Sequence, residues 1–563
     1  MRYHVRFPLL LFVAIVLIGL SYSFIAYTSE TSQFEKVDRL FAEFDKKDSP
    51  GAAIAIIRDG KILYSRGYGM ANLEYDIPIT SSTIFHVASV SKQFTAFAIA
   101  MLDDRGYLSL DDDVRDYIPE FPDFGETITI RQLIHHISGL RDQWELLAMA
   151  GWRLDDVITK EHILKMLEHQ RELNFKPGEE YLYSNMGYTV LAEIVGRVTG
   201  QSFQEWTQEN IFEPLGMGDT HFHEDHRHIV PNRAYSYSPD PDNDFRHSVL
   251  SYANVGATSL FTTVEDLAAW IKNYDSMDVG NERIMSTVHN RGKLNKGERI
   301  DYAFALQMQS YRGADVVGHG GADAGFRSYV GRFPAHGFAV VVLSNVSTMS
   351  PQRLACSIAD IFLADELLPA EARKEIPDRE RADIDPEIID QYIGRYKMQP
   401  GVVISLTRED DRLLMQTLGL DKVELIPMDE NRFFRDDINL EITFEPGSDG
   451  KIYHMTMNQD GNSTPAIRID GNKPTSEELH RYTGTYYSDE LGTFYTIELR
   501  EDRLVATHRR HSDIELTPII NTRFSGNQWW FRTVEFVEDR RDGVEGFLLS
   551  GGRVRNIYFE KQN

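Results

Sequence analysis

A serine and a lysine three residues apart, Ser89 and Lys92 in HVASVSKQFTAF (86–97), are the first side chains whose spacing could support chemistry. A serine hydroxyl becomes an effective nucleophile when a neighbouring base takes its proton. An apolar stripe follows the pair and Gly106 stands where a helix cap is expected, so both side chains should lie on one face of a helix entrance. The pattern permits nucleophilic catalysis without requiring it, because an ordinary polar helix start has the same letters.

The same spacing occurs once more, from Ser448 to Lys451, where PGSDGK spells a turn. At ordinary residue usage, roughly one or two such matches are expected by chance in a chain of this length. The motif alone is therefore weak evidence for catalysis, and catalytic partners for Ser89 must be sought elsewhere in the chain.

Two further stretches offer such partners. FKPGEEYLYSNMGY (175–188) places Tyr183, a potential acid/base, and Asn185, a potential hydrogen-bond donor to a substrate amide or partner of the lysine, just before a helix. In VVGHGGADAGFRSYVGRF, His319 and Gly321 precede a stretch expected to be an edge strand, where glycine lets a substrate approach the backbone. Each stretch taken alone is more often structural than functional.

Composition excludes several classes of function. The chain has 563 residues, 42% apolar and 26% charged, with a net charge of -27 and a pI near 5.1, so nucleic acid and anionic membrane surfaces would repel it. The single cysteine, Cys356, excludes internal disulfides and cysteine-based zinc sites and is expected in the core. The acidic stretch SPDPDND (238–244) lacks regular ligand spacing and is interpreted as a solvated loop, so neither a metal nor a cofactor is expected.

The N-terminus predicts export. Arg2 and Arg6 precede an apolar stretch that stays almost uncharged until Glu30, which is typical of a signal peptide or a membrane anchor over residues 1–28. The rest of the chain is then expected outside the cytoplasm, in a periplasmic or other extracytoplasmic space. The sequence leaves open whether the segment is cleaved.

Residues 35–375 mix the patterns of strands and helices. GAAIAIIRDGKILYSRGYG (51–69) predicts a hairpin turning at Asp59 and Gly60, and FRSYVGRFPAHGFAVVVLSN (326–345) predicts further strands. Helices are expected near 92–105, 130–137, 187–199 and 262–274, the last opened by a capping box of Thr262 and Glu265. Strands at both ends with helices between them indicate an α+β fold, an antiparallel sheet with flanking helices and a helical subdomain.

The chain after residue 380 repeats itself. YIGRY (392–396) returns as YTGTY (482–486), EDDRLL (409–414) as REDRLV (500–505), and LIPMDENRF (425–433) as LTPIINTRF (516–524), with offsets of 90, 91 and 91 residues. The repeats consist of short alternating segments such as LEITFE, which are typical of half-buried strands. Two small antiparallel β-barrels, lipocalin-like, are predicted over 385–470 and 478–563.

Taken together and in this order, the three stretches around Ser89, Tyr183 and His319 resemble the penicillin-recognising serine hydrolases. This superfamily contains class C β-lactamases, D-alanyl-D-alanine carboxypeptidases, D-aminopeptidases and related esterases. The resemblance covers about 35–370 and includes TIRQLIHHISGL (129–140) and SLFTTVEDLAAW (259–270). It implies a β-lactamase-like sheet, and the two barrels resemble the architecture of bacterial D-aminopeptidases, in which a barrel loop helps shape the substrate site.

The resemblance also implies roles. Ser89 would attack a carbonyl to form an acyl-enzyme, Lys92 would act as base, and Tyr183 would share that work and activate the deacylating water. The backbone N–H groups of Ser89 and Ala322 would form the oxyanion hole. Asn185, His319 and Gly321 would line the substrate site, and the pair His135 and His136 is interpreted as packing. Because His319 stands where β-lactamases usually have a lysine, efficient antibiotic hydrolysis is not expected.

The expected function is that of a serine hydrolase acting on D-amino-acid peptides or amides, in the manner of a D-aminopeptidase or D-Ala-D-Ala carboxypeptidase. An esterase or weak β-lactamase is the nearest alternative. A different class remains open: an exported penicillin-binding sensor that is acylated without turnover. The expected partners are a small peptide or ester, with cell-wall peptides as an attractive pool, and a membrane only through the N-terminal segment. The oligomeric state is left open.

Overall fold

The computed structural model describes residues 32–369 and 381–562, apart from short gaps in the second range. These gaps are 399–402, 418–421, 436–437, 448–449, 460–461, 470–473, 521 and 539–542. The predicted export segment 1–28 lies outside the described residues, as do much of the stretch joining the first region to the barrels and the serine of the PGSDGK motif. Among the helices that are described, none is long and apolar enough to cross a membrane.

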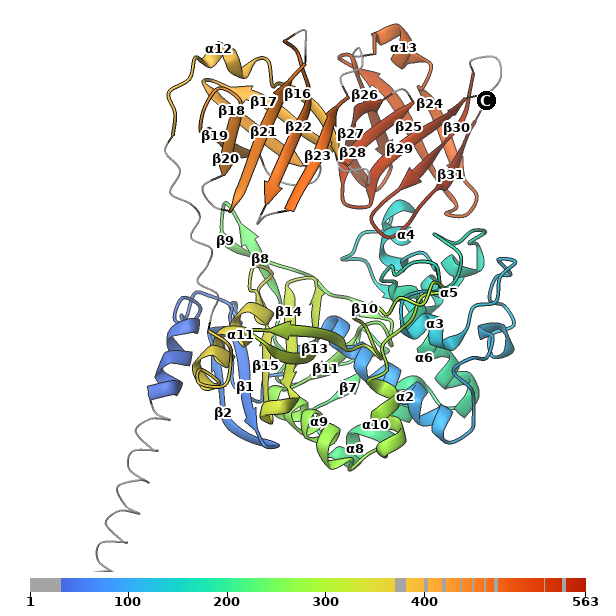
Figure 1. Ribbon diagram of the computed structural model, residues 1–563. Coiled ribbons are helices and arrows are strands. Elements are labelled where there is room, and N and C mark those ends of the chain that lie inside the picture. Colours follow the sequence, from blue (N-terminus) through green and yellow to red (C-terminus); the bar gives the residue numbers. More distant parts are fainter. Residues whose placement is uncertain are drawn as a thin grey trace, which may run out of the picture.

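A six-stranded antiparallel sheet forms the centre of the first region (Figure 1). Its spatial order is β12 (Gln307–Tyr311), β13 (Ala314–Asp323), β14 (Phe326–Phe333), β15 (Phe338–Ser344), β1 (Ala52–Arg58) and β2 (Lys61–Tyr68). The predicted hairpin is confirmed: β1 pairs with β2, and Asp59 and Gly60 both have positive φ at the turn. The hairpin of the first two strands therefore forms one side of the sheet, and β1 pairs with β15, the last strand of this region to enter the sheet.

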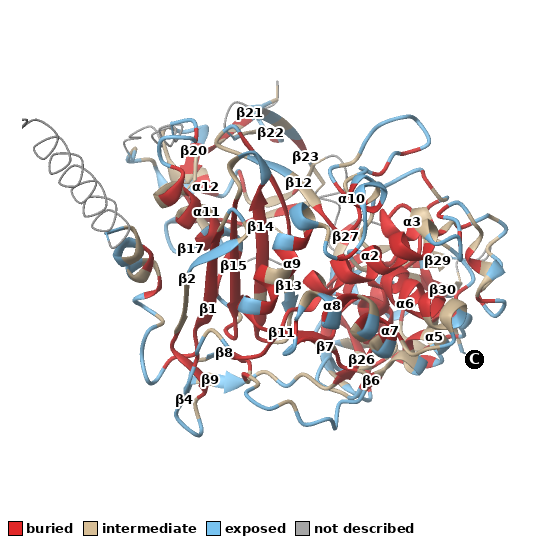
Figure 2. Cartoon of the chain, turned by 90° about the horizontal axis from the view of Figure 1, so that it is seen from below, coloured by how far each residue is buried: buried red, intermediate tan, exposed pale blue. Residues whose placement is uncertain are grey.

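Both faces of this sheet are covered, as alternate residues of β1 show. Ala53, Ala55 and Ile57 belong to one hydrophobic cluster, and Ala52, Ile54 and Ile56 belong to another. On one face α9 (Val264–Ser276) contacts β1, β2 and β15, and on the other α11 (Pro351–Phe362) contacts β14 and β15 (Figure 2). Burial on both faces explains why these strands read as continuous apolar runs.

The helical subdomain lies to one side of the sheet. Its principal helices are α2 (Ser91–Asp104), α3 (Ile130–Ile134), α4 (Gln143–Met149), α5 (Lys160–Glu168) and α6 (Asn185–Thr199). Helices are thus present at all four predicted positions. Gly106 has a φ of 73° just beyond α2, as expected of a residue that ends a helix.

One predicted cap and one predicted core residue are wrong. The N-cap of α9 is Thr263, whose hydroxyl accepts the N–H of Asp266, because Thr262 is still extended and paired with Phe85 in strand β11 (Leu260–Thr262). Cys356 is only half-buried, since it lies at the border of the face through which α11 packs on the sheet.

Two closed barrels of eight strands each follow, as the repeats predict (Figure 1). The first contains β16 (Gly394–Met398), β17 (Val403–Glu409), β18 (Arg412–Thr417), β19 (Val423–Pro427), β20 (Arg432–Arg435), β21 (Leu440–Pro446), β22 (Ile452–Gln459) and β23 (Asn462–Arg468). The second contains β24 (Gly484–Ser488), β25 (Thr493–Arg500), β26 (Arg503–His508), β27 (His511–Ile520), β28 (Arg523–Gln528), β29 (Phe531–Glu538), β30 (Val544–Ser550) and β31 (Ile557–Lys561).

The repeated tyrosines have the same place in both barrels. Tyr392 stacks on Phe444 with ring centroids 4.1 Å apart, and its counterpart Tyr482 stacks on Phe536 at 4.3 Å. In the first barrel Tyr396 donates a hydrogen bond to the carbonyl of Tyr392. The repeated letters therefore encode the barrel core.

The second barrel packs against α4 of the helical subdomain (Figure 1). Tyr495 of β25 donates a hydrogen bond of 3.1 Å to the carbonyl of Met149, and His511 donates one of 2.8 Å to that of Ala148. One hydrophobic cluster runs from α2 and α4 into this barrel, whereas the core of the first barrel forms a cluster of its own. The two copies thus relate differently to the hydrolase-like region.

Candidate active site

Ser89 lies in a single 3-10 turn, Ala88–Val90, directly before α2. Ala88 has a φ of 48°, a left-handed conformation that is unfavourable for a residue with a side chain. Hydrogen bonds from Ser328 Oγ to the Val87 carbonyl (2.7 Å) and from Val87 N–H to the Leu260 carbonyl (3.0 Å) hold the preceding residue in place. The turn leaves Ser89 partly accessible, while both of its neighbours are buried.

Ser91, two residues on, has a structural role. Its hydroxyl donates to the Ala88 carbonyl at 2.5 Å and accepts the N–H of Leu260 at 3.1 Å. These bonds join the turn to β11, and the side chain is fully buried. Of the two serines in SVSK, Ser89 is therefore the one available for chemistry.

Lys92 is completely buried, and its amine lies 3.2 Å from Ser89 Oγ. The amine also donates to Asn185 Oδ1 at 2.8 Å and to the carbonyl of Ala257 at 2.6 Å. Among the described residues, no carboxylate forms an ion pair with it. Burial lowers the pKa of Lys92 to about 7, although the negative charges of Asp323 and Asp142 partly oppose the shift. A substantial fraction of this lysine is thus neutral near pH 7 and able to accept a proton.

Tyr183 and Asn185 come from the chain that enters α6. The Tyr183 hydroxyl is buried, and the Lys92 amine lies 5.0 Å from the centre of its ring. Burial raises the pKa of Tyr183 well above its usual value, with the Ser89 hydroxyl acting in the opposite direction, so the phenol is protonated at rest. The rings of His136 and Tyr183 are 4.1 Å apart, and His136 Nδ1 accepts the N–H of Ser184, so this histidine packs against the site.

Asp142 fixes the orientation of Asn185 and was missed by the sequence analysis. Its Oδ2 accepts both the backbone N–H and the side-chain amide of Asn185, at 2.8 and 2.7 Å. Its Oδ1 caps α4 by accepting the N–H of Trp144. The spacing of Asp142 and Glu145 before an apolar run is a helix-start signal, but nothing local reveals the bond to Asn185.

His319 lies within β13 and not before an edge strand, which corrects the expectation. β13 is the second strand of the sheet, but β12 pairs only as far as Gly318. Among the described strands, none pairs with the outer edge of residues 319–323, so this edge has room for a substrate strand to pair. His319 itself is buried: its Nδ1 bonds with the Gly320 carbonyl and its Nε2 with the Tyr302 hydroxyl, and burial lowers its pKa to about 4.

Gly321 allows β13 to pass directly against the turn that carries Ser89. A Cβ at this position would lie 2.3 Å from the Val87 carbonyl, 2.4 Å from Ser328 Oγ and 3.0 Å from Ser89 N. Ala322 follows immediately, and both Ala322 and Ser89 line the same pocket. The sequence-predicted residues Ser89, Asn185, His319, Gly321 and Ala322 all line one pocket together with Tyr183.

The Gly321→Ala variant is expected to lose at least about 100-fold in kcat/KM, because a shift of roughly 1 Å in a reacting group has this effect. Steady-state kinetics and thermal unfolding of the purified variant measure it. Gly320→Ala is the matched control, since its nearest contact would be an ordinary 3.5 Å to the Ser328 carbonyl. Equal activity of the two variants would contradict the close approach inferred here.

The pocket has a volume of about 560 Å³ and is open to solvent above Ser89. The hydrolase-like region supplies all of its lining except one residue, Arg553 of the second barrel. Arg553 lies far from every motif in the sequence, so only the folded chain reveals it.

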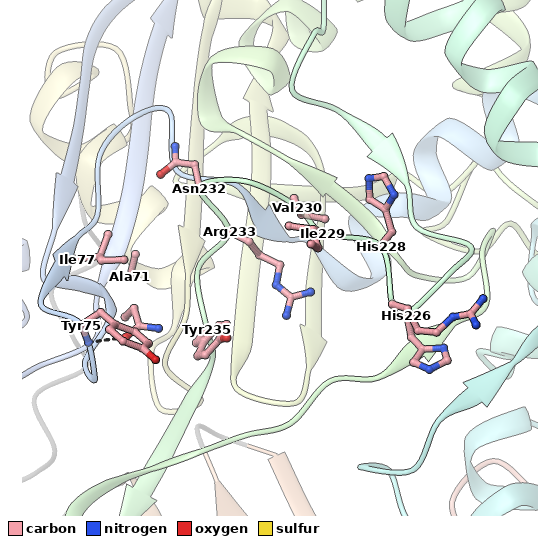
Figure 3. Close-up of a pocket in the computed structure, with 12 residues that line it drawn as sticks. Ala71, Tyr75, Ile77, His226, His228, Ile229, Val230, Asn232, Arg233 and Tyr235 are labelled. Atoms are coloured by element: carbon pink, nitrogen blue, oxygen red, sulfur yellow. Dashed lines mark hydrogen bonds between the residues drawn. The ribbon is translucent and has the colours of Figure 1, made fainter.

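A second pocket, of about 500 Å³, lies between residues 71–77 and 226–235 (Figure 3). Its lining includes His226, His228 and Arg233 but neither Ser89 nor Lys92. In the described part of the chain, no group of three or more His, Cys, Asp or Glu side chains is arranged to hold a metal ion. The pocket at Ser89 is therefore the candidate active site.

Comparison with known proteins identifies the family of the chain. The family model described as Beta-lactamase matches residues 37–362, and a domain of unknown function (DUF3471) matches 378–470. Penicillin-binding protein 4* of Bacillus subtilis is 28% identical over 447 residues, covering 76% of this chain and 97% of that protein. D-aminopeptidase of Gluconobacter oxydans is 30% identical over 297 residues, which is 53% of this chain but only 56% of that enzyme.

Solved structures show the same fold at lower identity. The octameric penicillin-binding protein homologue from Pyrococcus abyssi has a TM-score of 0.55 at 23% identity, covering 86% of this chain and 99% of that one. D-amino acid amidase from Ochrobactrum anthropi SV3 has a TM-score of 0.50 at 20% identity, covering 59% and 99%. With the match to more than half of its residues, the chain belongs to the beta-lactamase family and is a serine hydrolase.

Proposed function

We propose that the protein hydrolyses amide bonds in peptides containing D-amino acids, by way of an acyl-enzyme on Ser89. The observation that carries this proposal is the buried Lys92 amine, which lies 3.2 Å from Ser89 Oγ and forms no ion pair with a carboxylate of the described residues. The D-aminopeptidases among the relatives and the D-amino acid amidase among the similar folds support the choice of substrate class.

In the first half-reaction Ser89 Oγ attacks the carbonyl carbon and its proton passes to Lys92. The backbone N–H groups of Ser89 and Ala322 stabilise the resulting oxyanion. The proton then moves to the leaving nitrogen through Tyr183, whose phenol is protonated at rest, and the C–N bond breaks. Tyr183 and Lys92 would next take a proton from the water that attacks the ester, which releases the acid and restores Ser89.

His319 supports an amidase more than a β-lactamase. Both of its ring nitrogens are engaged by Gly320 and Tyr302, and its low pKa keeps it neutral near pH 7. A neutral, fully bonded imidazole gives little attraction to the carboxylate of a β-lactam. Nitrocefin is therefore expected to be a poor substrate.

A substrate panel tests the proposal. D-Ala p-nitroanilide, N-acetyl-D-Ala-D-Ala, short p-nitrophenyl esters and nitrocefin are compared on the chain lacking residues 1–28, each beside its L-isomer where one exists. Turnover of D-amides, abolished in Ser89→Ala, is the expected result. Turnover of esters alone overturns the amide proposal, and stable acylation by a fluorescent penicillin without any turnover indicates a sensor.

We also propose that this site works outside the cytoplasm, because the charge and hydropathy of residues 1–28 are those of an export segment. D-amino-acid peptides of the cell wall would then be within reach. Fractionation of cells producing the full-length chain checks this: recovery in the cytoplasmic fraction would contradict it.

A further inference from the structure

The loop 551–556, which joins β30 to β31 of the second barrel, is fixed against the hydrolase domain. The carboxylate of Glu145 accepts the backbone N–H groups of Gly552 (3.1 Å) and Arg553 (2.7 Å). The Arg553 carbonyl in turn accepts the side-chain amide of Asn174 at 2.8 Å. These bonds hold the backbone of Arg553 beside the pocket.

Two residues further on, the same loop is anchored again. Arg555 N–H donates to Asn174 Oδ1 at 2.8 Å, and the buried guanidinium of Arg141 donates to the Arg555 carbonyl at 2.9 Å. The Arg555 side chain pairs with Glu180 at 2.9 Å. Its positive charge is therefore matched within the protein.

The charge of Arg553 is not matched in this way. Its guanidinium lies 4.9 Å from the centre of the Tyr183 ring, and the closest carboxylate oxygen with which it pairs is Asp142 Oδ2 at 3.9 Å. Within the described residues its side chain donates no hydrogen bond, and it is 44% exposed. An arginine in this state presents free donors to the pocket.

Asp142 cannot satisfy this arginine without giving up other bonds. Its Oδ2 already accepts two hydrogen bonds from Asn185, and its Oδ1 accepts one from Trp144 N–H. Asp142 is also only 1% exposed, so water cannot replace these hydrogen bonds if the carboxylate rotates toward Arg553. The Asp142 carboxylate serves Asn185, and the guanidinium remains available.

The other charged side chains of the pocket are engaged. Asp323 Oδ2 pairs with His86 Nε2 at 3.0 Å and also with Thr258. Arg327 donates to the carbonyls of Ala324 (3.1 Å) and Phe326 (2.7 Å). Of the two guanidinium groups in the lining, only that of Arg553 has all its donors free for a ligand.

We propose that Arg553 forms a carboxylate-binding subsite and makes the enzyme prefer substrates that carry a negative charge close to the scissile amide. A guanidinium offers two parallel N–H donors that match a carboxylate, and it repels an ammonium group. The inference rests on the proposed amide hydrolysis at Ser89 and refines it. A free N-terminal amine, which an aminopeptidase substrate carries, is disfavoured beside Arg553.

The carboxylate could come from either side of the scissile bond, and two sets of probes separate the sources. For the acyl side, N-succinyl-D-Ala, N-acetyl-D-Ala and D-Ala p-nitroanilides place a negative, neutral or positive group in the same position. For the leaving side, N-acetyl-D-Ala-D-Ala is compared with its C-terminal amide. In one of these two sets, the native enzyme should show a higher kcat/KM for the anionic substrate than for the neutral one.

Arg553→Gln is expected to lower kcat/KM about tenfold more for that anionic substrate than for the neutral one, with the difference mainly in KM. Arg553→Glu should shift the preference toward the substrate with an ammonium group. Arg555→Gln is the matched control, because it removes the same charge from the same loop but from a paired side chain. Arg327→Gln tests the second guanidinium of the pocket.

The outcomes separate the two proposals. If no D-amide is hydrolysed in a Ser89-dependent manner, the proposed function fails. If D-amides are hydrolysed but Arg553→Gln leaves the preference of the native enzyme unchanged, or if Arg327→Gln alone removes it, the subsite at Arg553 is overturned. A native preference for the free amine likewise overturns it. Near-ultraviolet circular dichroism and the melting temperature confirm that each variant is folded.

Discussion

Replacing Ser89 with alanine is expected to lower kcat by about 10⁴-fold or more and to abolish covalent labelling, because it removes the hydroxyl that forms the acyl-enzyme. Ser89 is the hydroxyl next to the Lys92 amine, and it lies on the pocket surface. Initial rates with a D-amino-acid p-nitroanilide and intact-mass measurement after exposure to a penicillin check the two parts. A change at a partly exposed hydroxyl should leave the melting temperature nearly unaltered.

Ser91→Ala is the control, since it removes the neighbouring hydroxyl of the same motif. The Leu260 N–H would lose its acceptor in a buried position, at a cost of about 1–3 kcal/mol in the free energy of unfolding. Covalent labelling should persist in this variant. Labelling lost in Ser91→Ala but kept in Ser89→Ala would reverse the assignment of the nucleophile.

Replacing Lys92 with arginine is expected to lower kcat/KM about 10³-fold, within the range that general-base catalysis contributes. A guanidinium stays protonated at any accessible pH and so cannot take the proton of Ser89. In the native enzyme kcat/KM should rise with pH through about 7 and then level off, because the base is active when neutral and burial lowers the pKa of Lys92 to about 7. The pH profile of kcat/KM measures this, and the rise should be absent in the variant.

Lys92→Met provides a second variant, because a long apolar side chain fits a fully buried site even if arginine does not fold there. Lys272→Arg, on the exposed surface of α9, is the matched control and should retain the native profile. Full activity in Lys92→Met, or a native profile that is flat between pH 6 and 8, would contradict the role of the lysine as base.

The sequence predicted the parts of the fold that depend on local patterns. The β1–β2 hairpin follows from two apolar runs around Asp59 and Gly60, and the two barrels follow from the repeat, because the same buried tyrosines, Tyr392 and Tyr482, recur in both. Capping and periodicity placed Ser89, Lys92, Tyr183 and Asn185 near helix starts, but their roles came from the resemblance to the penicillin-recognising serine hydrolases.

The remaining features depend on contacts that no local pattern encodes. The bond between Asp142 and Asn185 joins two helix starts, and the position of Arg553 depends on how a barrel docks on α4. The two repeats share the residues that form their barrel cores, so the repeat does not indicate which barrel contributes a residue to the pocket. The expectation for His319 was wrong because strand order depends on pairing: β12 covers half of β13 and leaves the other half free.

The unequal packing of the two barrels has a consequence for cooperativity. Because the second barrel shares one continuous hydrophobic cluster with α2 and α4, separating it would expose apolar surface on both partners, and the two should unfold as one thermodynamic unit. The core of the first barrel forms a separate hydrophobic cluster, so this barrel can unfold independently of the helical subdomain. Ser89 and Arg553, which come from distant parts of the chain, thus belong to a single folding unit, so loss of the second barrel's structure would also remove the scaffold of the nucleophile.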